Sequence, residues 1–141
     1  MMGTWGVHIK AFNTGHDGSL STGHANSPKD MISRLETMVL MGMDLPLPAI
    51  ERQIASGLDI IVHLGRLRDK SRKVLEVTEV LGYWDGQIHL QTIYRYEEIR
   101  KEDENVTENE KKDQENKVHG EWKKVAELFH REKLMAAGYY I

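Results

Sequence analysis

The chain has 141 residues, no cysteine and a formal net charge of −3, from 19 basic and 22 acidic side chains. This length fits one domain, and the lack of cysteine excludes a disulfide framework and a Cys-based zinc site. Its apolar runs are far shorter than the ~20 residues that cross a bilayer, and its first residues lack the pattern of a secretory signal. The small negative charge gives no general reason to expect DNA or RNA binding, so nucleic acid is not among the expected partners.

Two helices are predicted in the first half of the chain. Ser27 can accept a hydrogen bond from the backbone N–H of Asp30, and Pro28 is well tolerated in the first helical turn. Apolar residues then recur at helical spacing as far as Gly42, which suits a helix end. A second amphipathic helix is predicted over residues 47–57, and it also ends at a glycine.

After these helices the pattern becomes that of strands. Residues 59–64 are short, β-branched and apolar on both faces, which predicts a buried strand. Residues 72–83 and 87–96 predict a hairpin, because Asp85 and Gly86 form a strong turn signal between them. Strict alternation would place these side chains of the second hairpin strand on one face: Ile88, Leu90, Thr92, Tyr94 and Tyr96.

The last third of the chain divides by charge. Residues 97–117 hold nine acidic and five basic side chains and no aromatic residue. Such a segment cannot bury enough apolar surface to offset its ordering entropy, which predicts a charged, flexible loop. A binding tail for a basic partner is the less favoured alternative. The tail 118–141 fits either one helix or a strand stub followed by a short helix over residues 130–137.

The densest polar cluster covers residues 14–26, with two histidines, four hydroxyls and three glycines. Its histidine spacing fits neither a zinc finger nor a helical metal pair, so no metal is expected. A serine nucleophile elbow is also disfavoured, because Gly18 lies three residues before Ser21 rather than two. Two interpretations of residues 14–26 remain open. They form either a loop that donates hydrogen bonds to an anion such as phosphate or a polar loop that only caps helices.

Other candidate chemistry is sparse. No Gly-x-x-x-x-Gly-Lys-Ser/Thr sequence is present, so the chain lacks the loop that cradles nucleotide phosphates. His63 lies within an apolar strand pattern and is interpreted as a core histidine. Three further histidines, His89, His119 and His130, lie among solvated residues.

A family resemblance favours the anion-binding interpretation. The sequence AFNTGHDGSLSTGHAN, followed by SPKDMISRLETMVLM and by AIERQIASGLDIIVHLGRLRDKSRKV, resembles the type II/IV secretion ATPase superfamily. The likeness is greatest to the ATPases of tight-adherence (Tad, Flp) pili. It covers residues 11–96, is weaker over 118–141, and rests above all on the box of two histidines followed by Ser-Arg-Leu-Glu.

The resemblance implies an α/β fold, an incomplete RecA-like P-loop ATPase domain, within a hexameric ATPase that uses ATP and Mg²⁺. It implies a cytoplasmic location at an inner-membrane platform of pilus or secretion proteins. In this family the box lies beside the nucleotide γ-phosphate. The positions carried over as catalytic are His16, Thr22 and His24. Those carried over as nucleotide-contacting are Thr14, Gly15, Ser19 and Asn26.

The chain also departs from the family pattern. Residues 1–10 are atypical and show neither the Walker A nor the Walker B motif, which hold magnesium and the phosphates. We therefore expect no ATP turnover by this chain alone and interpret it as the C-terminal part of a longer ATPase. The alternative is a non-catalytic remnant, or an interaction module that binds intact ATPase subunits. An apolar sheet face left open is expected in either case.

Overall fold

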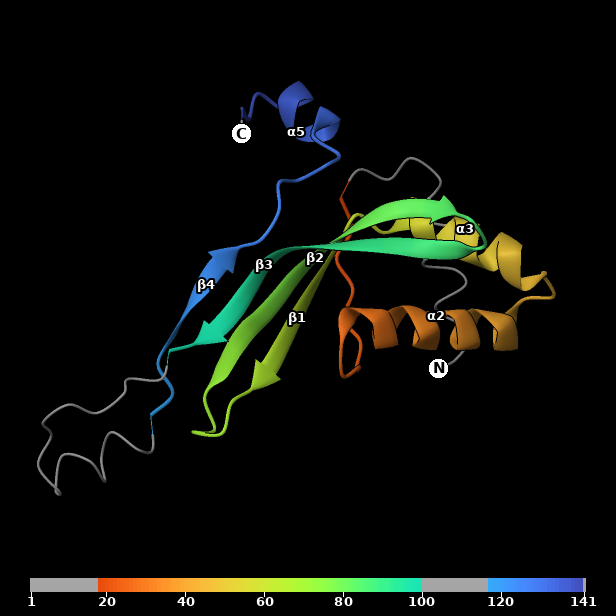
Figure 1. The fold of residues 1–141 in the computed structure, drawn as a ribbon. Coiled ribbons are helices and arrows are strands. Elements are labelled where there is room, and N and C mark those ends of the chain that lie inside the picture. Colours follow the sequence, from red (N-terminus) through yellow and green to blue (C-terminus); the bar gives the residue numbers. More distant parts are fainter. Residues whose placement is uncertain (1–17, 100–116, 141) are drawn as a thin grey trace, which may run out of the picture.

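A computed structural model describes residues 18–99 and 117–140. Within these ranges two helices are followed by a four-stranded sheet and a short helix (Figure 1). The elements are α2 (Pro28–Gly42), α3 (Leu47–Gly57), β1 (Ile60–Arg66), β2 (Arg72–Trp84), β3 (Gln87–Glu98), β4 (Gly120–Lys124) and α5 (Glu132–Ala136). The order predicted from the sequence, a helix pair, a strand and a hairpin, is confirmed.

The strands follow one another in the sheet in the order β1-β2-β3-β4, and every pair is antiparallel. The described residues therefore form a mixed α/β arrangement built on an antiparallel meander. Figure 1 shows the β2–β3 hairpin lying along α3, while the other half of the sheet, with β4, extends away from the helices. The sheet is thus covered by helices at one end and open at the other.

The helical layer supplies the main core. Its buried aliphatic side chains come from α2 and α3 and are Ile32, Leu35, Val39, Ile50 and Ile54. Side chains from the sheet pack against this cluster, among them Ile61, Ile88 and Leu90. Both helices end at the predicted glycines, Gly42 and Gly57. Helical periodicity alone was enough to predict both helices, because each helix buries a single face.

The β2–β3 hairpin turns where the sequence predicts, but its side-chain alternation is interrupted. Asp85 and Gly86 both adopt positive φ, 53° and 72°, as this two-residue turn requires. A β-bulge at Ile93 shifts the register, because Thr78 pairs with Thr92 while Val77 pairs with Tyr94. Ile93 is consequently buried and Tyr94 is exposed, so the prediction of one continuous face from Ile88 to Tyr96 was wrong.

Strand β1 also differs from its prediction. It pairs with β2 along one side and forms an edge of the sheet, rather than a buried central strand. Ile61 packs toward the helices, whereas Ile60, Val62 and Leu64 are 41%, 49% and 64% exposed. His63 is half-buried rather than a core residue. Apolar residues on both faces predicted two covering layers, but the described fold supplies a layer on one side.

The C-terminal part follows the strand-then-helix alternative. Strand β4 pairs with the end of β3, which runs to Glu98, so Glu97 and Glu98 belong to the sheet. Residues 100–116 of the predicted charged loop lie outside the described residues. Helix α5 ends before Gly138, whose φ of 86° suits a helix C-terminus.

Candidate functional site

The polar loop that precedes α2 is the candidate site, and the structure describes its second half. Thr14, Gly15 and His16 lie outside the described residues. Ser19 and Thr22 lie in an irregular segment and are exposed. His24 and Asn26 are exposed too, immediately before the helix. The described residues thus present these groups to solvent rather than around a pocket.

What the structure does bring together is a polar network at the start of α2. The Ser27 hydroxyl accepts from the Asp30 backbone N–H at 3.0 Å, which confirms the predicted cap. The Asp30 carboxylate in turn accepts from the Asn26 backbone N–H at 2.9 Å and lies 3.4 Å from Arg34 Nε. This reciprocal pattern satisfies helix N-terminal donors and fixes the angle at which the loop enters the helix.

The network has a consequence for the candidate chemistry. Asp30 places a carboxylate at the positive end of α2, which occupies the position that a bound anion would take at that helix end. An anion would therefore have to be met by the loop itself, through side chains such as Thr22 and His24. Hydroxyl and imidazole N–H groups can donate to phosphate oxygens, and a rigid helix start limits where the loop can place them.

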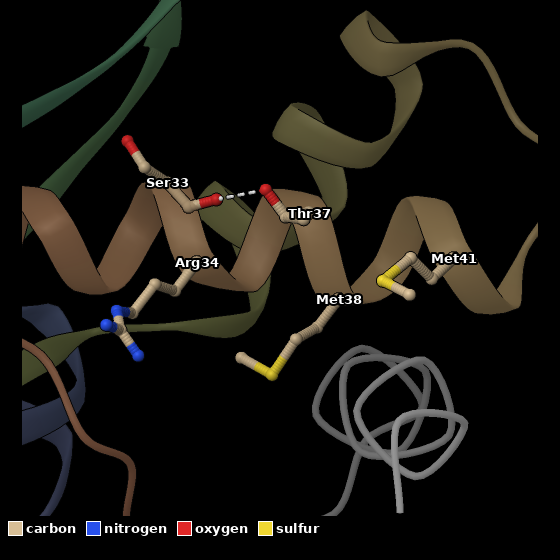
Figure 2. A pocket seen from close by; sticks show the side chains of 5 residues that line it. All are labelled: Ser33, Arg34, Thr37, Met38 and Met41. Carbon is tan, nitrogen blue, oxygen red and sulfur yellow. Dashed lines mark hydrogen bonds between the residues drawn. The ribbon is translucent and has the colours of Figure 1, made fainter.

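A shallow pocket lies further along α2, on its outward side (Figure 2). It is lined by Ser33, Arg34, Thr37, Met38 and Met41. Figure 2 shows Arg34, Met38 and Met41 pointing to the same side of the helix, while the Thr37 hydroxyl donates to the Ser33 carbonyl at 3.1 Å. All five residues come from one helix, and two of them are methionines with flexible side chains. The pocket therefore brings no second element to the candidate loop.

Two glutamates in β2 organise polar contacts that the sequence analysis missed. Glu79, 1% exposed, accepts from the backbone N–H groups of Phe129 and His130, both at 2.8 Å. Glu76 accepts from the hydroxyls of Thr78 and Thr92, at 3.0 and 2.6 Å. The available signal was an acidic residue at two positions of a largely apolar, valine-rich strand, where a carboxylate needs buried donors.

These contacts hold the segment that follows β4, residues 127–130, against the sheet. Besides the two bonds to Glu79, the Gln91 side chain donates to the Glu127 carbonyl at 2.7 Å. His130 Nε2 lies 2.8 Å from the Leu81 carbonyl oxygen. His130 is therefore anchored to the sheet, and His89 stacks on Trp84 with ring centroids 3.8 Å apart. Both histidines thus make structural contacts, and His130 is also exposed, in line with its position among solvated residues.

Among the residues that the structure describes, four charged groups have shifted pKa values, and each shift has a local cause. Hydrogen bonds from the Ser71 hydroxyl and the Val118 backbone lower the pKa of Asp69 to about 2. The hydrogen bond to Lys124 lowers the pKa of Glu127, and the bond to Glu97 raises that of Lys123. On α2, burial and then the nearby charge of Glu51 raise the pKa of Glu36.

Two kinds of feature are absent from the described part of the chain. Residues 18–99 and 117–140 contain no cluster of three or more histidine or acidic side chains that could hold a metal ion. No helix in those ranges has the length and apolarity needed to cross a membrane.

The described residues thus define a mixed α/β domain in which a histidine-bearing loop leads into a capped helix. Comparison with known proteins assigns this domain to a family. Residues 3–135 match the family described as type II/IV secretion system protein. The match covers most of the chain, so the chain belongs to this family, as the two-histidine box indicated.

Two individual relatives are named as conjugal transfer proteins. A Mycobacterium tuberculosis protein named "Putative conjugal transfer protein" is 31% identical over 86 residues, 61% of this chain and 24% of that protein. "Conjugal transfer protein TrbB" of Rhizobium radiobacter is 34% identical over 84 residues, 60% of this chain and 24% of that protein. The matched region therefore spans about a quarter of the length of these relatives.

Proposed function

We propose that this chain is part of an ATPase that drives a secretion, conjugal transfer or pilus-assembly system. The observation that carries the proposal is the family match over residues 3–135. The relatives named for conjugal transfer support a transfer machine in general. The likeness of the histidine box to that of tight-adherence pilus ATPases supports the more specific assignment to pilus assembly. ATP with Mg²⁺ would be the energy source.

Within that ATPase, we assign the histidine loop to the nucleotide γ-phosphate. His16, Thr22 and His24 would donate to phosphate oxygens as charge develops there, with Thr14, Gly15, Ser19 and Asn26 shaping the same loop. The exposure of Thr22 and His24 supports this role, because side chains that face solvent are available to a ligand. The network of Ser27 and Asp30 would transmit a loop movement to α2, as switch loops do after hydrolysis.

We propose further that the ATPase assembles as a hexamer with a RecA-like domain and works in the cytoplasm at an inner-membrane platform. The printed sequence has no Walker A motif, and the groups that hold Mg²⁺ and the β-phosphate must then come from other sequence. We therefore expect the 141-residue chain to show no ATP turnover by itself.

The first test is phosphate release by the purified chain with ATP and Mg²⁺. The expected rate equals that of the protein-free control. Robust turnover that His24→Ala abolishes would contradict the expected inactivity and would place the whole catalytic site in this chain. His119→Ala is the matched control, since His119 is also an exposed histidine and lies outside the loop.

The second test asks whether the loop works in a complete enzyme. Translation of the DNA upstream of Met1 should show a Gly-x-x-x-x-Gly-Lys-Ser/Thr in frame or one base out of frame. In a polypeptide that joins the upstream Walker A sequence to these 141 residues, His24→Ala should lower kcat about 100-fold. This is the loss expected when one hydrogen-bond donor to the transition state is removed. Unchanged kcat would refute the assignment of the histidine loop.

A second candidate function is an interaction module that binds intact subunits of such an ATPase. The open half of the sheet favours it, because an exposed apolar face is typical of a binding surface. Adding the chain to an intact ATPase of the family should then lower its turnover in proportion to the amount added. Turnover that does not change would leave the first proposal as the better one.

A further inference from the structure

The turn between β1 and β2 carries a concentrated positive charge. Residues 66–73 hold five basic side chains and one acidic side chain. Four of the basic residues alternate along the turn, and all four are exposed: Arg66, Arg68, Lys70 and Arg72. Figure 1 shows this turn at the end of the sheet that extends away from the helices. The turn is therefore a protruding basic surface on a chain whose net charge is −3.

The acidic residue of the turn, Asp69, is held by donors within the fold. Its carboxylate accepts from the backbone N–H groups of Ser71 and Val118, both at 2.9 Å, and from the Ser71 hydroxyl. The Leu67 N–H donates to the Ser71 carbonyl, and the Lys70 N–H donates to the Leu67 carbonyl. These bonds fix the backbone from which the basic side chains project, and a preorganised surface loses less free energy when a partner binds.

Arg66 and Arg72 form a like-charge pair at the base of the turn. They lie directly opposite each other on β1 and β2, so their side chains share one face of the sheet. Among the described residues, none of the ion pairs involves Arg66, Lys70 or Arg72. Like charges placed opposite each other destabilise a sheet. A carboxylate between the two guanidinium groups would replace this repulsion by attraction to both of them.

Lys70 gives a second indication of function. Its φ of 67° lies in the left-handed region, which glycine enters without steric cost and lysine does not. The chain nevertheless has a cationic side chain at this position of the turn. A residue held in an unfavourable backbone conformation points to a role for its side chain.

The neighbouring strands limit the shape of the anion. At the same end of the sheet, Glu97 of β3 lies opposite Glu121 of β4, and Glu98 lies 3.7 Å from Arg68. The surface of a bilayer or of a nucleic acid is broad and carries many charges, so it would meet these carboxylates together with the bases. A short acidic peptide can bind the turn alone. The surrounding charges therefore favour a peptide over a larger polyanion.

We propose that the β1–β2 turn, residues 66–72, is a docking site for an acidic segment of a partner protein, whose carboxylates bind Arg66, Lys70 and Arg72. Arginine binds carboxylates with paired hydrogen bonds, which gives such a site geometric specificity. The contact involves no nucleotide, so its test is independent of the ATPase function proposed above. Alternate side chains of an extended segment point to the same side. The probe is therefore a synthetic peptide in which glutamate alternates with serine.

Titration of the isotope-labelled full chain with this peptide, followed by NMR at low salt, tests the proposal. We expect saturable binding that weakens as salt is added, with chemical-shift changes concentrated at residues 66–73. Reversal of the pair, Arg66→Glu with Arg72→Glu, should raise the Kd at least about tenfold. The reversed variant should instead bind a peptide in which lysine alternates with serine. Its pair is still like-charged, so the repulsion within the fold is unchanged.

Two controls separate docking from net charge and from folding. Lys29→Glu with Lys133→Glu reverses the same number of charges at exposed positions of α2 and α5, and it should leave the Kd within about twofold of wild type. Lys70→Gly should raise the Kd about threefold, the effect of one exposed ion pair. It should not lower the thermal midpoint, because glycine accepts a φ of 67°.

Several results would overturn the proposal. These are the absence of saturable binding, an equal Kd for the wild type and the reversed pair, and chemical-shift changes centred outside residues 66–73. Tighter binding to vesicles of phosphatidylglycerol and phosphatidylcholine than to the glutamate peptide would overturn it in favour of a lipid surface. Tighter binding to a DNA duplex would overturn it in favour of nucleic acid.

Discussion

The helical layer and strand β1 place the same kind of side chain in opposite surroundings. Ile50 and Ile54 of α3 are fully buried, between α2 and the β2–β3 hairpin. Val62 and Leu64 of β1 are half or more exposed, although their sequence is equally apolar. The difference lies in what covers them, because a helix or a sheet is buried only where a second layer packs on it. Apolar patterning therefore marks surfaces that need a cover, whether or not the described residues provide one.

Replacement of a core isoleucine should give the largest effect and would test the comparison directly. Ile54→Ala is expected to lower the free energy of unfolding by about 2–5 kcal/mol, since it removes buried methylene groups and leaves a cavity. Leu64→Ala on β1 should cost well under half of that, because Leu64 is 64% exposed. Urea denaturation of the monomeric chain measures both. Equal losses would show that β1 is covered as thoroughly as the core.

An intermediate effect is expected where a polar group, rather than a layer of aliphatic side chains, covers the sheet. Glu79→Gln leaves one of the Phe129 and His130 N–H groups facing an amide NH₂. The expected loss is about 1–3 kcal/mol, the cost of an unsatisfied buried donor. It should appear as faster tryptic cleavage at Arg131, in the C-terminal segment.

The matched control for this experiment is Glu97→Gln, because Glu97 is exposed and pairs with Lys123 on the surface. This variant should be cleaved at the wild-type rate. If Glu79→Gln is also cleaved at the wild-type rate, the C-terminal segment is held by its other contacts and not by this carboxylate.

The smallest effect concerns the open end of the sheet and depends on pH. The pKa of Asp69 is about 2, below its ordinary value of 3.8, because the ionised carboxylate accepts from Ser71 and Val118. A depressed carboxyl pKa stabilises the fold above pH 4, and this stability is lost as pH falls through 2. Asp69→Asn should therefore lower the thermal midpoint at pH 6, and its difference from wild type should shrink toward pH 2. A difference that does not vary with pH would contradict this role.

Much of the local structure followed from short-range signals. The Ser27 cap, the ends of both long helices and the Asp85-Gly86 turn were predicted, because each depends on a few neighbouring residues. The two-histidine box also indicated the family to which the chain belongs. These signals are reliable because capping and tight turns need particular residue types whatever the rest of the chain does.

The errors came from longer-range features. Alternation could not reveal the bulge at Ile93, where one extra residue reverses the exposed and buried sides of β3. It could not show that Glu79 would meet backbone donors fifty residues further along the chain. For the candidate site, the sequence identified Thr22, His24 and the helix start at Ser27, and the structure added the bond from the Asn26 backbone N–H to the Asp30 carboxylate.

The sequence by itself determined the element order, the helix caps and the family, because these depend on local residue chemistry and on characteristic motifs. The tertiary structure decided which apolar faces are buried. Strand β1 has the composition of a buried strand, yet its edge and one face stay open since the described fold places helices on the other side. Burial depends on the neighbours that a surface finds, and a single strand's sequence does not specify those neighbours.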